Sequence, residues 1–204
     1  MLKAGFGSIV VLAACGALAG CGGSGSSGGG TPGYADLIGE GDALFDEALT
    51  MDITDADSLP TSGSAQYDGV MAVEVYADDD DAGGLESSIF LAGDLAMNVD
   101  FGAVDPISGS VTNIADSDEA RYGGSLSLGA STLNRVADPE DDWQFEADLA
   151  GTITDPEGLA WDIDTDMRGD FVGEQAGYAA GEVEGSACGS LDCSYVYGGF
   201  IAAK

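Results

Sequence analysis

The sequence predicts an all-β fold, a small antiparallel eight-stranded β-barrel preceded by a short helix. From residue 66 onward, apolar and polar residues alternate with a period of two, in segments bounded by Gly, Asp, Ser and Pro. One apolar and one polar face per segment is typical of antiparallel strands that bury a single face. Eight such strands can close into a barrel filled by side chains, which removes exposed sheet edges. A two-sheet sandwich is the structural alternative.

The N-terminal segment is expected to direct export and to be removed. Residues 4–20 are apolar or small, and the run is too short for a transmembrane helix, which needs roughly 18 apolar residues. It ends in the letters LAGC at residues 18–21, which resemble the lipobox of bacterial lipoproteins. That resemblance implies cleavage before Cys21 and acylation of its thiol. Cleavage before Cys15 and an ordinary secretory signal are the alternatives.

The segment after Cys21 is expected to be a flexible tether. Residues 22–30 read GGSGSSGGG, which offers no side chain able to build a core. Gly22 stands where an Asp often retains lipoproteins in the inner membrane, so the sequence favours the outer membrane, on its cell-surface or periplasmic face. The predicted domain organisation is a signal peptide over 1–20, a tether over 21–33, a helical lead-in over 34–57 and a barrel over 58–204.

A helix is predicted ahead of the strands. Apolar residues recur at roughly helical spacing between residues 34 and 50, and Gly39 and Gly41 weaken the first half. We therefore expect a helix over 41–50 that plugs one end of the fold or lies against it. The apolar positions that predict it are Leu37, Ile38, Leu44, Phe45 and Leu49.

The strands follow in order along the rest of the chain. Trp143 and Trp161 begin two of them on the apolar face, where core packing is expected. The opposite face of one strand carries three aspartates, which argues against a barrel with a lipid-facing exterior. Those aspartates are Asp162, Asp164 and Asp166. The predicted strands cover 66–76, 89–101, 108–115, 123–133, 143–153, 161–167, 177–186 and 194–203.

The charge balance is strongly acidic. The chain has 37 Asp and Glu against 5 Lys and Arg, a formal net charge of −32. Nucleic acid is excluded as a partner because phosphate binding needs a basic surface. An anionic membrane would also repel the chain, so lipid must provide the attachment to the membrane. The charge fits either attraction of cations or a basic partner, or solubility in a salty habitat.

The chain contains no histidine. This excludes catalysis by Ser-His-Asp or Cys-His groups, metal ligation by imidazole, and the usual general base near neutral pH. No cofactor is indicated by any motif. We therefore expect a protein that is not an enzyme.

The remaining cysteines, Cys188 and Cys193, are expected to form a disulfide. Export places them in an oxidising compartment, where a disulfide is the default. The closed loop is short, which limits the stabilisation to roughly 2 kcal/mol. Metal binding by two thiols alone is the weaker alternative.

Three further motifs have a functional and a structural interpretation. An acidic run between the first two strands offers oxygen ligands to Ca²⁺, but it lacks EF-hand spacing and also reads as a solvated hairpin loop. The aspartates at 162, 164 and 166 fit a metal or basic ligand, or simply a solvated face. The letters RGD at 168–170 lie within a strand and are discounted. The acidic run comprises Asp78, Asp79, Asp80 and Asp81.

Three segments of the chain resemble the barrel domain of transferrin-binding protein B and its relatives. They are LPTSGSAQYDG at 59–69, GDFVGEQAGYAAG at 169–181, and the closing strand YGGFIAAK at 197–204. The resemblance covers about residues 58–204 and implies a surface-lipoprotein barrel with recognition by its loops. The full receptor has two lobes, each with a handle domain and a barrel, whereas this chain has room for one barrel. Transferrin itself is therefore a doubtful ligand.

Taken together, these features predict a lipid-anchored binding protein of the cell envelope. Candidate ligands are a host protein, or an iron- or haem-carrying protein or haem itself, in which case the chain would be an accessory to iron or haem acquisition. The alternative is a structural or envelope-interaction lipoprotein without a small-molecule ligand. We expect a monomer held to the outer membrane by its N-terminal lipid.

Overall fold

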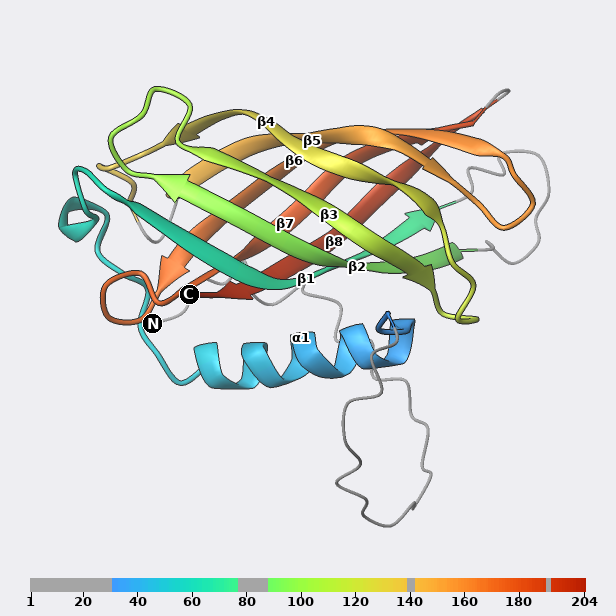
Figure 1. Cartoon of the computed structure of the whole chain (residues 1–204). Coiled ribbons are helices and arrows are strands. Elements are labelled where there is room, and N and C mark those ends of the chain that lie inside the picture. Colours follow the sequence, from blue (N-terminus) through green and yellow to red (C-terminus); the bar gives the residue numbers. More distant parts are fainter. Residues whose placement is uncertain (1–30, 77–87, 139–141, 190–191) are drawn as a thin grey trace, which may run out of the picture.

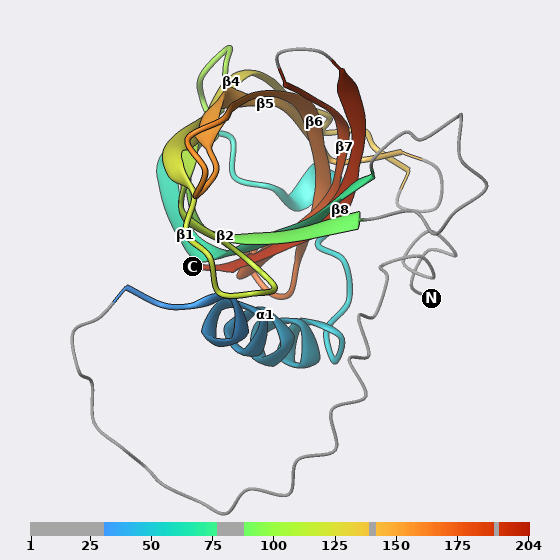
Figure 2. The same cartoon turned by 90° about the vertical axis from the view of Figure 1, so that its right-hand side faces the viewer.

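The barrel is closed. The computed structural model describes residues 31–76, 88–138, 142–189 and 192–204. Eight strands pair antiparallel with their neighbours in chain order, and the last strand pairs with the first, which excludes the sandwich (Figures 1 and 2). The strands are β1 (Ser64–Tyr76), β2 (Ser88–Asp100), β3 (Ile107–Asp116), β4 (Gly123–Leu133), β5 (Phe145–Thr154), β6 (Ala160–Val172), β7 (Tyr178–Cys188) and β8 (Cys193–Ala203).

Most strand boundaries differ from the prediction by one or two residues, and two of the differences have a structural reason. β6 continues to Val172, beyond the predicted end at 167, and its last four residues are all buried. With both faces covered, the alternation that marks a half-exposed strand disappears there. β5 begins at Phe145 rather than at Trp143, and the buried residue before it is Gln144, which the alternation placed on the polar face.

The barrel interior is apolar, and its aromatic side chains gather at one end. An aromatic cluster fills that end, with Phe171 at its centre. The ring centroid of Phe171 lies 5.1 Å from that of Phe145 and 5.9 Å from those of Tyr67 and Phe101. Tilted pairs at these separations are favourable beyond the area that they bury. Most of the remaining core residues are aliphatic, and Tyr122 and Trp161 pack against the core as partly buried residues.

The helix α1 (Tyr34–Ala48) begins seven residues earlier than the predicted helix and includes both glycines. It lies along the outside of the barrel, against β1, β2 and β8, so it lies against the fold and does not plug it (Figures 1 and 2). Leu37 is buried there with the outward-facing Val70 and Ala92. Tertiary packing on this apolar strip offsets the low helix propensity of the glycines.

A short segment after α1 connects the helix to the barrel end that holds the aromatic cluster. Ile53 forms a β-bridge with Val172, and a single 3₁₀ turn, η2 (Ala56–Ser58), follows. Leu59 is buried in the main core. Within the described residues, no helix is long and apolar enough to cross a membrane.

Candidate functional site

The interior of the barrel leaves almost no free space. The central cavity that described residues line has a volume of about 20 Å³, which is room for about one water molecule. Its walls are aliphatic, with residues such as Met71, Leu91 and Leu149. A ligand the size of haem therefore does not fit inside, and the surface and loops are the parts of the barrel that can meet a ligand.

One side of the outer surface is an acidic wall formed by β5, β6 and β7. Among the solvent-accessible outward positions of these strands, seven carry carboxylates and one carries a guanidinium, that of Arg168. The carboxylates of β5 and β6 are exposed and those of β7 are half-buried. The seven acidic residues, which we call the acidic wall, are Glu146, Asp148, Asp162, Asp164, Asp166, Glu182 and Glu184.

The register of the sheet places like charges directly opposite one another. Asp166 on β6 pairs with Asp148 on β5 and with Glu184 on β7. Like charges opposite each other on neighbouring antiparallel strands destabilise a sheet. The acidic wall is therefore not explained by the needs of the fold.

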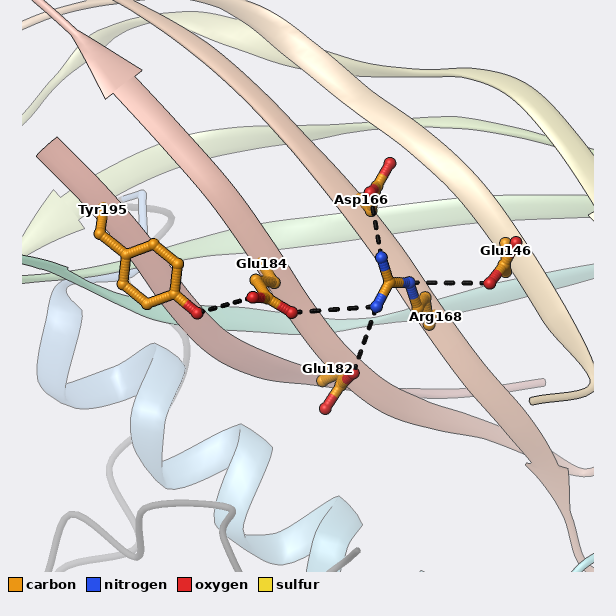
Figure 3. A network of polar contacts seen from close by, with 6 residues as sticks. All are labelled: Glu146, Asp166, Arg168, Glu182, Glu184 and Tyr195. Atoms are coloured by element: carbon orange, nitrogen blue, oxygen red, sulfur yellow. Dashed lines mark hydrogen bonds and ion pairs between the residues drawn. The ribbon is translucent and has the colours of Figure 1, made fainter. Parts of the chain in front are cut away.

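Arg168 is the one cation within this wall, and it is shared among four carboxylates (Figure 3). Its guanidinium lies 3.1 Å from Asp166, and 3.7 to 3.9 Å from Glu146, Glu184 and Glu182. Each of these ion pairs is open to solvent and contributes little alone. One guanidinium also leaves most of the negative charge of seven carboxylates uncompensated.

A row of tyrosines borders the acidic wall on β8 and β1. Tyr195 donates a hydrogen bond of 2.9 Å to Glu184 (Figure 3), and its ring lies within 6.0 Å of Tyr76 and is stacked at 6.5 Å on Tyr197. Partial desolvation of the phenol and this hydrogen bond raise the pKa of Tyr195 to about 12. Tyrosine beside carboxylates suits contact with cationic side chains.

Two neighbouring loops at the aromatic end of the barrel present apolar side chains to solvent. Val104 and Val136 are 91 and 89 % exposed. Arg135 holds the two loops together, because its guanidinium donates to the carbonyl oxygens of Leu59 at 3.1 Å and Phe101 at 2.6 Å. Both valines fall between predicted strands, but no motif in the sequence singled them out as a possible contact surface.

The cysteine prediction is confirmed for the pair in the barrel. Cys188 and Cys193 form a disulfide. They face each other in register at the ends of β7 and β8, so the bond closes that hairpin. Cys21 and the acidic run Asp78, Asp79, Asp80 and Asp81 lie outside the described residues.

The other predicted site residues are placed mostly as expected. The aspartates at 162, 164 and 166 are exposed, and among described residues no group of three or more acidic or cysteine side chains is arranged to hold a metal ion. The RGD motif lies within β6, where Asp170 is fully buried. Trp161 is half-buried against the main core, and Trp143 is half-buried just before β5.

Comparison with family models, with curated proteins and with solved structures finds no match to this chain. Its surface chemistry and its sequence motifs therefore carry the functional argument.

Proposed function

We propose that this chain is a lipid-anchored protein of the outer membrane that binds a protein partner with a basic surface. The lipobox at residues 18–21 and the Gly/Ser tether support the anchor. The resemblance of residues 58–204 to the barrel of transferrin-binding protein B supports a binding role rather than an enzymatic one. The absence of histidine from the chain agrees with this role.

The single observation that carries the choice of partner is the row of opposed carboxylates on β5, β6 and β7. Asp148, Asp166 and Glu184 repel one another across the sheet, and Arg168 offsets that repulsion only in part. A partner that brings Lys or Arg side chains to this row relieves the repulsion and gains from charge complementarity. The neighbouring tyrosines add contact area of the kind that is enriched at protein interfaces.

If the protein takes part in iron or haem acquisition, it would do so by binding a second protein that carries the iron or haem. The filled interior gives haem no site inside the barrel. The carrier would instead contact the acidic wall or the loops at the aromatic end. This narrows the proposal to recognition on the outer surface.

The anchor is tested by acylation in the producing cell. Mass spectrometry of the N-terminal peptide is expected to find a diacylated Cys21, and Cys21→Ser is expected to lose the acyl groups and move the protein to the soluble fraction. Cys15 is the matched site for comparison, since Cys15→Ser should leave acylation unchanged. Acylation that persists in Cys21→Ser would refute the anchor at this residue.

The binding surface is tested by removing its charge. The chain from residue 31 to 204 serves as bait for envelope extract, spent medium and serum. Asp148→Asn with Asp166→Asn and Glu184→Gln is expected to weaken retention of a basic protein by about tenfold, equivalent to about 1.4 kcal/mol. A control with Glu40→Gln, Asp42→Asn and Asp46→Asn on exposed positions of α1 changes the net charge equally.

Comparison of the two variants distinguishes binding at the acidic wall from retention by net charge alone. Equal loss in both would mean that net charge alone retains the protein, which contradicts a binding site on the wall. Reproducible failure of the unaltered chain to retain any protein would favour the structural lipoprotein.

A further inference from the structure

The barrel has two different ends, and α1 runs along its side from one to the other (Figure 1). The turn at 117–122 and the turn at 155–159 lie at one end, which we call the tether end. The loops at 101–106 and 173–177 and the C-terminus lie at the other end, which holds the aromatic cluster and which we call the far end from here on. Val104 and Val136 are at the far end.

Hydrogen bonds hold the start of α1 at the tether end. The carboxylate of Glu119, in the turn between β3 and β4, accepts hydrogen bonds from the backbone N–H groups of Tyr34 at 2.9 Å and Ala35 at 3.0 Å. These are donors that the first turn of a helix leaves unpaired, and a carboxylate also suits the positive end of the helix dipole. Arg121 donates to the carbonyl oxygen of Thr31 at 2.8 Å.

The body of the helix is seated on the barrel along its whole length. Near its start, Leu37 is buried with Val70 and Ala92. At its end, Ala48 is buried with Ala180 and Ile201 near the far end. The helix therefore fixes the point at which the preceding chain meets the barrel, beside the turn between β3 and β4.

We infer that the docked α1 orients the anchored protein, with the tether end toward the lipid surface and the far end pointing away from it. This rests on the proposed anchor at Cys21. From its Gly/Ser-rich composition, a linker of the length of residues 22–33 is expected to span roughly 20 Å. The barrel is longer, because a 13-residue strand tilted by about 40° extends roughly 30 Å along the barrel axis. The tether end is therefore held closer to the bilayer.

Release of α1 would remove this preference. The segment free of the barrel would then extend from residue 22 to residue 52, because Ile53 remains bridged to Val172 at the far end, and a coil of that length spans roughly 30 Å, which is comparable to the barrel itself. Either end could then approach the lipid. The docked helix thus makes outward presentation of the far-end loops a property of the fold.

The two tryptophans provide matched reporters. Trp161 lies at the tether end, where its indole N–H donates to Asp155 at 3.4 Å, and Trp143 precedes β5 at the far end. Both are half-buried. Trp143→Phe and Trp161→Phe each leave a single donor for energy transfer to a dansyl-labelled headgroup in phosphatidylcholine vesicles.

The chain from Cys21 onward is coupled through the Cys21 thiol to a maleimide lipid in these vesicles, with the Cys188–Cys193 disulfide intact. Transfer from Trp161 is expected to exceed transfer from Trp143 several-fold. Leu37→Asp places a charge in the buried contact between α1 and the barrel, and it is expected to reduce the difference in transfer between Trp161 and Trp143 to less than twofold. Circular dichroism verifies that the barrel remains.

Equal transfer from the two tryptophans in the unaltered chain, or greater transfer from Trp143, would overturn the orientation. If Leu37→Asp unfolds the barrel, Glu119→Ala with Arg121→Ala is used instead, because it removes only the hydrogen bonds that hold the start of α1. This variant must still reduce the difference in energy transfer between the two tryptophans. Coupling by maleimide makes the result independent of acylation in cells. Failure of the anchor at Cys21 therefore remains distinguishable from failure of the orientation.

Discussion

Gln144 joins three separate segments at the far end of the barrel. Its side-chain amide donates to the carbonyl oxygen of Thr54 in the lead-in and accepts from the backbone N–H of Phe171 on β6 at 3.0 Å. Its own N–H donates to the Gly169 carbonyl oxygen and to Asp170, both at 3.1 Å. A buried amide with these partners fixes the lead-in to the barrel wall.

Replacing this amide is expected to be costly. Gln144→Leu leaves the Phe171 N–H and the Thr54 carbonyl buried without these partners, and we expect a loss of about 2–4 kcal/mol in the free energy of unfolding. Urea unfolding measures it. Gln66→Leu, at an exposed position of β1, is the control and should change stability by less than about 0.5 kcal/mol. Similar values for the two variants would show that the amide does not hold the lead-in.

Alternation predicted the buried face of nearly every strand but not this residue. A period of two assigns Gln144 to the solvent side because it reports only which way a side chain points. It carries no information on whether another segment covers that side. Thr54 and Asp170 lie far from Gln144 in sequence, so their proximity to it depends on closure of the barrel.

Tyr67 contributes a stability that depends on pH. Its side chain is fully buried and its hydroxyl donates to the carbonyl oxygen of Ala176 at 2.8 Å. Burial raises the pKa of this phenol well above its ordinary value of 10.0. The folded state therefore holds the proton more tightly than the unfolded state, and this contribution is complete below pH 10 and declines as the pH rises above it.

Tyr67→Phe is expected to separate this effect from the other tyrosines. The loss of the hydrogen bond should cost about 1 kcal/mol at neutral pH, and the decline in stability between pH 10 and 11 should become shallower. Urea unfolding at a series of pH values measures both. Tyr122, whose pKa burial and nearby carboxylates raise to about 12, contributes equally in both proteins. Parallel declines in the two proteins would contradict a role for Tyr67.

At the scale of elements, α1 shows where local sequence and tertiary structure disagree. The prediction began the helix at residue 41 because Gly39 and Gly41 lower helix propensity. The structure begins it at Tyr34, because Leu37 packs on the barrel and Glu119 caps the first turn. The strands were predictable because each carries its own alternation, whereas the start of α1 depends on residues on β1, β2 and the β3–β4 turn.

The two helix glycines are not required by packing, and their replacement should stabilise the protein. A methyl group at Gly39 meets no atom within 4 Å, and one at Gly41 lies in ordinary contact, 3.6 Å from Val70. Gly39→Ala and Gly41→Ala are each expected to add about 0.5–1 kcal/mol. Gly181→Ala on β7 is the opposite case, because its methyl group would overlap the Arg168 carbonyl oxygen, and should cost about 1–3 kcal/mol. Thermal melting ranks the three, and a destabilising Gly39→Ala would refute the argument.

At the scale of the whole molecule, charge acts on the fold and on recognition together. A formal net charge of −32 places self-repulsion over the entire surface, and the acidic wall concentrates it on β5, β6 and β7. Composition alone predicted the sign and size of this charge. Which carboxylates meet across the sheet was not predictable, because a shift of one residue in register would change every pair.

Stability should therefore rise with ionic strength. Between 0.01 and 1 M NaCl the screening length falls from about 30 to about 3 Å, and we expect the melting temperature to rise by several degrees. CaCl₂ at matched ionic strength separates screening from binding. We expect no additional rise with calcium, because the acidic run at residues 78–81 lacks the ligand spacing of an EF-hand. An additional rise that vanishes when Asp78, Asp79, Asp80 and Asp81 are all changed to Asn would instead establish a calcium site in that run. A melting temperature that is independent of NaCl would mean that self-repulsion contributes little to the stability of the folded chain.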